Sequence, residues 1–139
     1  MVDALKVELV APEKLFLSES VDMVVLPGSE GDFGVMLGHS PLISMLRSGE
    51  IVIFEGGEIK NRILIGGGFA EVTGTLCTVL SEEVENVSEI DRDEAEQMLS
   101  EVEEEMRNTD DILIREKLSN KRAHLAARIA AVQRPAYSS

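Results

Sequence analysis

The sequence predicts a mainly β N-terminal domain, a β-sandwich of about ten short strands, followed by a C-terminal antiparallel α-helical hairpin. Two observations lead to this prediction. Up to about residue 87, short runs of alternating apolar and polar residues recur between glycine-rich turns, with no helical periodicity between them. Beyond that point, apolar residues recur three or four positions apart in two runs joined by a short link. The chain should therefore divide into a sandwich domain at 1–87 and a hairpin domain at 88–139.

The first predicted strand runs from Leu5 to Leu9, because its apolar residues alternate with Lys6 and Glu8. Further strands are predicted at residues 15–17, 21–26, 51–54, 59–65, 69–72 and 76–80. Turn signals separate them at Gly56-Gly57, Gly66-Gly67-Gly68 and Thr73-Gly74. No Lys-Ser or Lys-Thr follows the three glycines, so we interpret them as a bulge or turn between strands rather than as a phosphate-binding loop.

Residues 26–50 are predicted to form a folded, glycine-rich loop that joins two strands. Glycines recur there every three or four positions, and Pro27 and Pro41 fix the backbone near its two ends. Val35, Met36 and Leu37 should give this loop an apolar anchor that a disordered tract would lack. A loop of this kind is usually kept for contact or for chemistry.

The first helix is predicted to open at Ser88 or Asp91, either of which could start a capping box, and to end near residue 108. Its apolar stripe consists of Ala95, Met98, Leu99, Val102 and Met106. The second helix should begin at Asp110 or Asp111 and stop before Pro135. Its stripe consists of Ile114, Leu118, Leu125, Ile129 and Val132.

The hairpin should be held together weakly and should also dock weakly. The first helix is rich in acids and the second in bases, so the two attract each other, but exposed ion pairs contribute only about 0.2 to 1 kcal/mol each. Both apolar stripes are narrow and rich in alanine, which leaves little surface to bury against the sandwich. A weakly docked element of this kind can move.

Composition excludes several classes of partner and site. The net charge of -13 repels nucleic acid and anionic lipid, and no apolar run approaches the roughly 20 residues of a membrane-spanning helix, so we expect no nucleic-acid binding and no direct lipid insertion. The start at Met1-Val2-Asp3 lacks the order of a signal peptide, so the chain is expected to be mature and soluble from its first residue. The single cysteine, Cys77, lies in a strand-like run and is expected to be a small buried apolar residue.

No catalytic or metal site is predicted. The neighbouring His39 and Ser40 do not give triad geometry, and the sequence around them lacks a nucleophile elbow. His39 and His124 lie in different segments, and no Cys/His pair has ligand spacing, so no metal is expected. We therefore expect no active site in this chain, although an esterase using Ser40 and a stand-alone ligand sensor remain as alternative functions.

The glycine-rich segment also resembles a known family. The run GSEGDFGV, followed by GHSPLIS, is similar to the epsilon subunit of bacterial and plastid F-type ATP synthases, as are GGGFAEV at 66–72 and TVLSEEVE at 78–85. Family members usually have proline where this chain has Leu37, while Gly38 to Leu42 keep the family pattern. The resemblance implies a non-catalytic central-stalk (rotor) subunit that binds the gamma subunit and the membrane rotor ring and couples proton flow to ATP synthesis.

The same resemblance implies two sets of contact residues. Those expected at the rotor ring, all at one end of the sandwich, are Glu30, Gly31, Asp32, His39 and Ser40. Those expected to inhibit ATP hydrolysis, by transient contact with the alpha and beta catalytic subunits when the hairpin opens along gamma, are Arg115, Lys117, Lys121, Arg122 and Arg128. The expected location is peripheral, on the cytoplasmic face of the bacterial plasma (inner) membrane.

Nucleotide binding is not expected from the resemblance. Some bacterial members bind ATP through an [IL]-D-x-x-R-A motif at the start of the first hairpin helix. The matching run here is Ile90-Asp91-Arg92-Asp93-Glu94-Ala95, in which Glu94 replaces the phosphate-attracting arginine by a repelling charge. We therefore expect no cofactor, and we expect Asp91 to serve as a helix cap.

Overall fold

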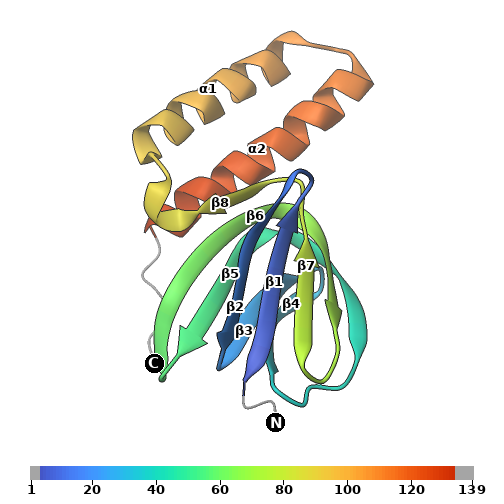
Figure 1. The fold of residues 1–139 in the computed structure, drawn as a ribbon. Coiled ribbons are helices and arrows are strands. Elements are labelled where there is room, and N and C mark those ends of the chain that lie inside the picture. The colour runs from blue at the N-terminus through green and yellow to red at the C-terminus, as the bar shows by residue number, and fades with distance from the viewer. Residues whose placement is uncertain (1–3, 134–139) are drawn as a thin grey trace.

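The computed structural model describes residues 4–133. Within that range, eight strands, a short 3-10 helix and two α-helices follow one another. They are β1 (Leu5–Ala11), β2 (Lys14–Val21), β3 (Met23–Gly28), β4 (Gly31–Met36), β5 (Leu42–Glu55), β6 (Glu58–Val72), β7 (Leu76–Leu80), β8 (Val84–Asn86), η1 (Val87–Glu89), α1 (Arg92–Asn108) and α2 (Ile112–Gln133). The predicted fold class, a β-sandwich followed by a helical hairpin, is confirmed (Figure 1).

The sandwich is a single sheet that folds over on itself. Its strand order is β2-β1-β7-β6-β5-β3-β4, with β8 paired to β6. β5 and β6 are 14 and 15 residues long, and they pair with each other from end to end while bending together (Figure 1). The strands are fewer than the predicted count of about ten because runs predicted separately, such as 59–65 and 69–72, are two halves of the same long strand.

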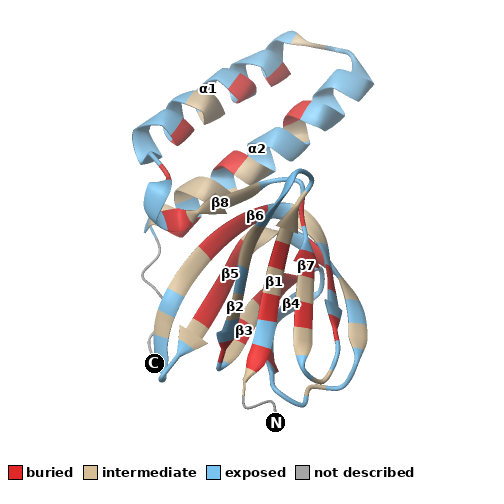
Figure 2. Ribbon diagram, in the orientation of Figure 1, coloured by how far each residue is buried: buried red, intermediate tan, exposed pale blue. Residues whose placement is uncertain are grey.

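The core of the sandwich follows the predicted alternation. Leu5, Val7 and Leu9 are at most 2% exposed, while Lys6 between them faces solvent (Figure 2). Cys77 is fully buried in the same core, as expected for a small apolar residue, and this burial raises the pKa of its thiol to about 11. The thiol is therefore protonated and unreactive at neutral pH.

The prediction of a loop over residues 26–50 was wrong for most of that segment. It contains the end of β3, all of β4 and the start of β5, so that only residues 29–30 and 37–41 lie outside strands. Glycine makes the tight β3–β4 connection possible, since a Cβ atom at Gly28 would lie 2.6 Å from the Gly31 carbonyl oxygen. Of the expected apolar anchor only Val35 is buried. Strand alternation turns Met36 outward, and Leu37 lies exposed in the turn after β4.

The three glycines at 66–68 lie inside β6 rather than between two strands. Gly67 and Gly68 have φ angles of 90° and 141°, a region that other residues rarely adopt. A Cβ atom at Gly68 would lie 2.0 Å from the carbonyl oxygen of Leu80 on β7. The glycines therefore let β6 bend while it stays paired with its neighbours.

Each helix of the hairpin begins directly after an aspartate that caps its first turn. The Asp91 carboxylate accepts a hydrogen bond from the Glu94 amide at 3.1 Å and opens α1, whereas Ser88 belongs to the 3-10 helix before it. The Asp111 carboxylate accepts from the amides of Leu113 and Ile114 at 2.9 and 3.2 Å and opens α2. The described part of α2 ends at Gln133, so Pro135 lies outside the described residues, as do Met1 to Asp3.

The hairpin rests on the sandwich through α2, and α1 lies on the far side of α2 (Figure 1). Val102 and Met106 of α1 pack against Leu118 and Leu125 of α2. A separate small cluster joins the other end of α2 to the sandwich, and its buried members are Leu64, Val87, Ile90 and Ala131. Between residues 4 and 133, no helix combines the length and apolar character needed to cross a membrane.

The described contacts predict that a chain ending at Val87 keeps the sandwich fold. The main core cluster contains no residue of either helix, so its packing does not depend on the hairpin. Loss of Ala131 uncovers Leu64, which should lower the thermal midpoint by only a few degrees. Circular dichroism and proton NMR of the shortened chain check this, and an unfolded product would contradict the division at residue 87.

Candidate functional site

The β3–β4 turn presents an acidic tip that is braced from behind. Glu30 and Gly31 are exposed, and the Ser29 amide donates to the Met45 carbonyl oxygen at 3.0 Å. The guanidinium of Arg47 donates both to the Gly28 carbonyl oxygen and to the Asp32 carboxylate. Asp32 is therefore already engaged by a cation of its own chain, while Glu30 at the tip remains exposed.

His39 and Ser40 lie at the other end of β4. The Gly38 amide donates to the Gly74 carbonyl oxygen at 2.7 Å, which places this loop beside the β6–β7 turn. A six-residue strand separates the two loops, and such a strand spans about 20 Å. The expectation that these two residues share one end of the sandwich with Glu30, Gly31 and Asp32 was wrong, because an extended strand carries the chain from one end to the other.

The His39 ring contacts a backbone atom. Its Nδ1 lies 2.8 Å from the Ser40 carbonyl oxygen. The hydroxyl group of Ser40 is not the partner in that contact, so the geometry gives no support to a histidine-activated serine.

An apolar row crosses the outer face of the sheet. Met45 of β5 lies opposite Phe69 of β6, which in turn lies opposite Leu80 of β7. The row continues through Val10 of β1 to Leu15 of β2. Met45, Phe69, Leu80 and Leu15 are 64%, 42%, 38% and 53% exposed, which is unusual for apolar residues in adjacent positions.

A hollow of about 500 Å³ adjoins this row and is lined by Val10, Pro12, Phe69 and Leu80 together with residues 66–68. Interpretation of the sequence did not identify this surface. A usable signal was present, because Ile43 and Met45 occupy the positions of β5 that alternate with Leu42, Ser44 and the buried Leu46. A strand with apolar residues at both odd and even positions has an apolar face on each side of the sheet, and each face needs another element or a partner to cover it.

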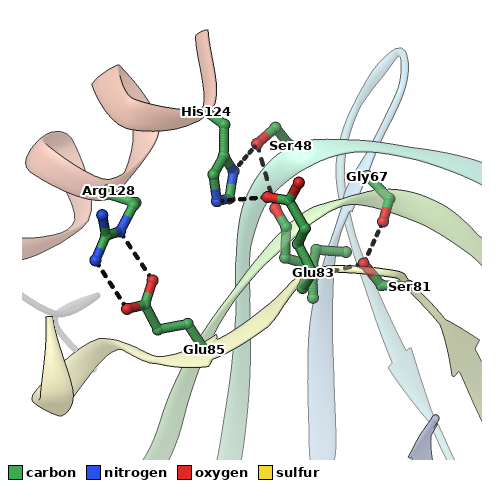
Figure 3. Close-up of polar contacts among 8 residues, drawn as sticks. Ser48, Gly67, Ser81, Glu83, Glu85, His124 and Arg128 are labelled. Atoms are coloured by element: carbon green, nitrogen blue, oxygen red, sulfur yellow. Dashed lines mark hydrogen bonds and ion pairs between the residues drawn. The ribbon is translucent and has the colours of Figure 1, made fainter. Parts of the chain in front are cut away.

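Polar side chains on one face of α2 hold the hairpin against the sandwich (Figure 3). We call this area of contact the seat of the hairpin. The Nε and Nη2 atoms of Arg128 each donate to one oxygen of the Glu85 carboxylate at 2.9 Å. His124 lies 3.0 Å from the Glu83 carboxylate through Nε2 and 2.9 Å from the Ser48 hydroxyl through Nδ1. At the end of α2, the Arg62 guanidinium donates to the Ala131 carbonyl oxygen at 2.9 Å and pairs with the buried Glu50.

The five basic residues expected to contact catalytic subunits do not form one free surface. Arg128 is held by Glu85, and the Arg115 guanidinium donates to the carbonyl oxygens of Met106 and Thr109 at the end of α1. Lys117 and Lys121 line a cleft of about 1000 Å³ between α2 and the sandwich, and Arg122 is exposed. A single docking surface made from all five would require the hairpin to leave its seat.

The segment that matches the nucleotide motif is used for structure. Asp91 caps α1, Ala95 is fully buried, and Ile90 is packed against α2. Arg92, which could have replaced the missing arginine, pairs with Glu96 at 3.0 Å along the same helix. Glu94 is exposed, so the start of α1 carries no free cation for a phosphate.

Metal ligation is likewise not indicated by the described side chains. From residue 4 to residue 133, no three His, Cys, Asp or Glu side chains lie close enough together to hold an ion.

Comparison with known proteins identifies the family. The profile of the ATP synthase, Delta/Epsilon chain, beta-sandwich domain family matches residues 4–87, which is more than half of the chain. The chain belongs to this family. The resemblance of GSEGDFGV and GHSPLIS to the epsilon subunit is thereby confirmed, and the chain is an accessory subunit of a membrane-associated ATP synthase.

Relatives named ATP synthase epsilon chain align over different lengths. The protein of Granulibacter bethesdensis is 47% identical over 96 residues, which is 69% of this chain and 71% of that protein. The protein of Rhodospirillum rubrum is 52% identical over 83 residues, covering 60% of this chain and 62% of the relative. The protein of Maricaulis maris is 39% identical over 133 residues and covers 96% of both chains, hairpin included.

Two solved structures share the fold. A chain in the mitochondrial ATP synthase of Euglena gracilis, described as OSCP/F1/c-ring, matches 96% of this chain and 84% of its own length with a TM-score of 0.85 and 22% identity. A chain in the central stalk/c-ring of the Tetrahymena thermophila mitochondrial ATP synthase matches with a TM-score of 0.62 and 16% identity, covering 95% of this chain and 98% of its own length. Both similarities are similarities of fold.

We predict that ATP does not bind to the first turn of α1. Millimolar ATP should leave the thermal midpoint unchanged, since a ligand stabilises a fold only by binding it. Glu94→Arg restores the motif and should create a measurable ATP-dependent shift if the rest of the site is intact, whereas the control Asp93→Arg makes the same charge change one position away and should not. A clear shift with the unmodified protein would contradict the prediction.

Proposed function

We propose that this chain is a non-catalytic rotor subunit of the central stalk in an F-type ATP synthase, where it binds the gamma subunit and the membrane rotor ring and couples proton flow to ATP synthesis. The observation that carries the proposal is the exposed apolar row on the sandwich in a chain of this family. A central-stalk subunit needs stiff contact surfaces rather than an active site. By the same proposal it lies peripherally on the cytoplasmic face of the bacterial inner membrane.

The apolar row is the surface that we assign to gamma. It runs across five neighbouring strands, from Met45 on β5 to Leu15 on β2, and is held rigid by the sheet beneath it. A permanent interface resembles a cut through a protein core, with large apolar side chains at its centre. Phe69, the aromatic member of the row, also lines the hollow and is the natural anchor for such an interface.

The β3–β4 turn is the surface that we assign to the rotor ring. Its tip offers the Glu30 carboxylate and exposed backbone, and Arg47 holds the turn in shape from behind. Charged and polar groups of this kind give register and orientation more than affinity. His39 and Ser40, at the opposite end of β4, are then left for a different contact.

The hairpin is the element that we assign to inhibition of ATP hydrolysis. Its seat on the sandwich is narrow, and its far tip exposes Ile112, Leu113 and Ile114 at 79%, 71% and 48%. The tip is exposed already, and when α2 leaves the sandwich the basic residues that face the sandwich become available beside it. They are suited to transient contact with the alpha and beta catalytic subunits.

Gamma binding should depend on the apolar row. Met45→Arg places a charge at its most exposed member, which should weaken copurification with gamma by at least tenfold because a buried unpaired charge is costly. The control Leu113→Arg makes the same change at an exposed apolar residue of the hairpin tip and should leave gamma binding intact. Equal loss in both variants, measured by pull-down with tagged gamma, would contradict the assignment.

Coupling should depend on the acidic turn. Glu30→Lys combined with Asp32→Lys should reduce ATP-driven proton pumping by membranes while the isolated subunit stays folded, because exposed charges contribute little to stability. The matched control carries Glu58→Lys and Glu89→Lys, which reverse two exposed acids outside this turn. Unchanged pumping with the turn variant, or equal loss with the control, would count against a ring contact here.

A further inference from the structure

We propose that His124 is a pH-sensitive latch, which holds the helical hairpin on the sandwich while its imidazole is protonated and loosens when the proton leaves. The inference rests on the proposed mobility of the hairpin and adds the condition that controls it. It concerns a side chain that neither the apolar row nor the acidic turn uses.

The latch is a continuous chain of three contacts between helix and sheet (Figure 3). The Glu83 carboxylate, in the connection between β7 and β8, lies 3.0 Å from Nε2 of His124. Nδ1 of the same ring lies 2.9 Å from the Ser48 hydroxyl on β5. That hydroxyl in turn lies 3.3 Å from the Ile65 carbonyl oxygen on β6.

Counting protons shows which form of the ring fits this chain. The Glu83 carboxylate and the Ile65 carbonyl oxygen can only accept, and the Ser48 hydroxyl has one proton to donate. If Ser48 donates to Ile65, Nδ1 must carry a proton of its own, and Nε2 must carry one to reach Glu83. Only the imidazolium has both protons, so every contact in the chain is satisfied at once in the charged form.

The neutral ring leaves one contact unmade. With its proton on Nε2, it can donate to Glu83, but Ser48 must then choose between Nδ1 of the ring and the Ile65 carbonyl oxygen. With its proton on Nδ1, an unprotonated Nε2 faces a carboxylate, which is an acceptor facing an acceptor. Either arrangement weakens the bond between helix and sheet, and histidine changes between its two forms within the range of pH 5 to 8.

Other charged groups line the same cleft as the ring. The sandwich contributes Glu82, Glu83 and Glu85 to the cleft, α2 itself contributes Lys117, Lys121 and Arg128, and α1 contributes the uncharged Met98. Arg128 is paired with Glu85, and this pair is a second contact between α2 and the sandwich. His124 is the one imidazole among the groups that line this cleft, and histidine is the side chain whose charge changes near neutral pH.

The remaining seat is small enough for this variation to matter. Its buried apolar part consists of Leu64, Val87, Ile90 and Ala131, and α1 adds no buried residue to it. The expected effect is nevertheless modest, because the Glu83 side chain is 63% exposed and its ion pair is screened by water. We expect the ratio of docked to undocked hairpin to fall by up to about fivefold as the pH rises from about 5.5 to about 8.

Fluorescence energy transfer within the full chain can measure this ratio. Dyes attached through Ser100→Cys on α1 and Glu58→Cys at the start of β6 report the separation of hairpin and sandwich, and both positions are exposed. Cys77 can stay in place, because it is fully buried and its thiol pKa is raised to about 11. Transfer should decrease as the pH rises, and added salt should reduce the difference between the two ends of the range.

His124→Gln should make the transfer independent of pH, since glutamine can still bond to Ser48 but does not titrate. His39→Gln is the matched control, because it removes the other of the two histidines in the sequence and should leave the pH dependence unchanged. A pH dependence that survives His124→Gln, that disappears with His39→Gln, or that runs in the opposite direction would overturn the latch. A transfer that is constant from pH 5.5 to 8 would also overturn it, while leaving the gamma and ring assignments to their own tests.

Discussion

The structure depends on the joint bend of β5 and β6. These two strands remain paired through the bend, so one sheet can cover both sides of a single core without an intervening connection. The bend requires glycine where other parts of the chain press against the backbone. A Cβ atom at Gly49 would lie 2.8 Å from the Pro27 ring, and one at Gly66 would lie 2.9 Å from the Glu83 side chain. The same bend brings Ser48, Leu64 and Gly66 to the surface that receives α2.

Local features of the fold were predictable from the sequence, and long-range ones were not. The alternation of Leu5, Val7 and Leu9 fixes which face of β1 is buried, and Asp91 and Asp111 have the side chains that open helices, so these predictions hold. Glycines inside strands look like those of a turn, and this similarity led to the wrong loop at 26–50, which includes the short strand β4, and to the division of the long strand β6. The prediction that Glu30 and His39 lie at the same end of the sandwich was wrong, because their closeness in the sequence does not show that a strand separates them.

The seat of the hairpin could not be predicted for the same reason. Ser48 and His124 are 76 positions apart, and Arg128 and Glu85 are 43 apart, so only the folded chain brings them together. The two kinds of surface differ in a way that fits their proposed partners. The outer row of the sheet is apolar and rigid, as in a permanent interface, whereas the seat of α2 relies on charged and hydrogen-bonded groups that can exchange with water.

The pairing of β1 with β7 has a consequence for how this chain is made. It is the one parallel pair among the described strands, and it joins Leu9 to Val79, so the first strand needs a neighbour that is synthesised much later. Until then, a nascent chain can form the β1–β2 hairpin, but the apolar side chains of β1 have no core to enter. Contacts between distant parts of a chain form slowly and leave strand edges open in the meantime. The emerging β1–β2 hairpin therefore keeps apolar side chains exposed until β7 has been synthesised and can pair with β1.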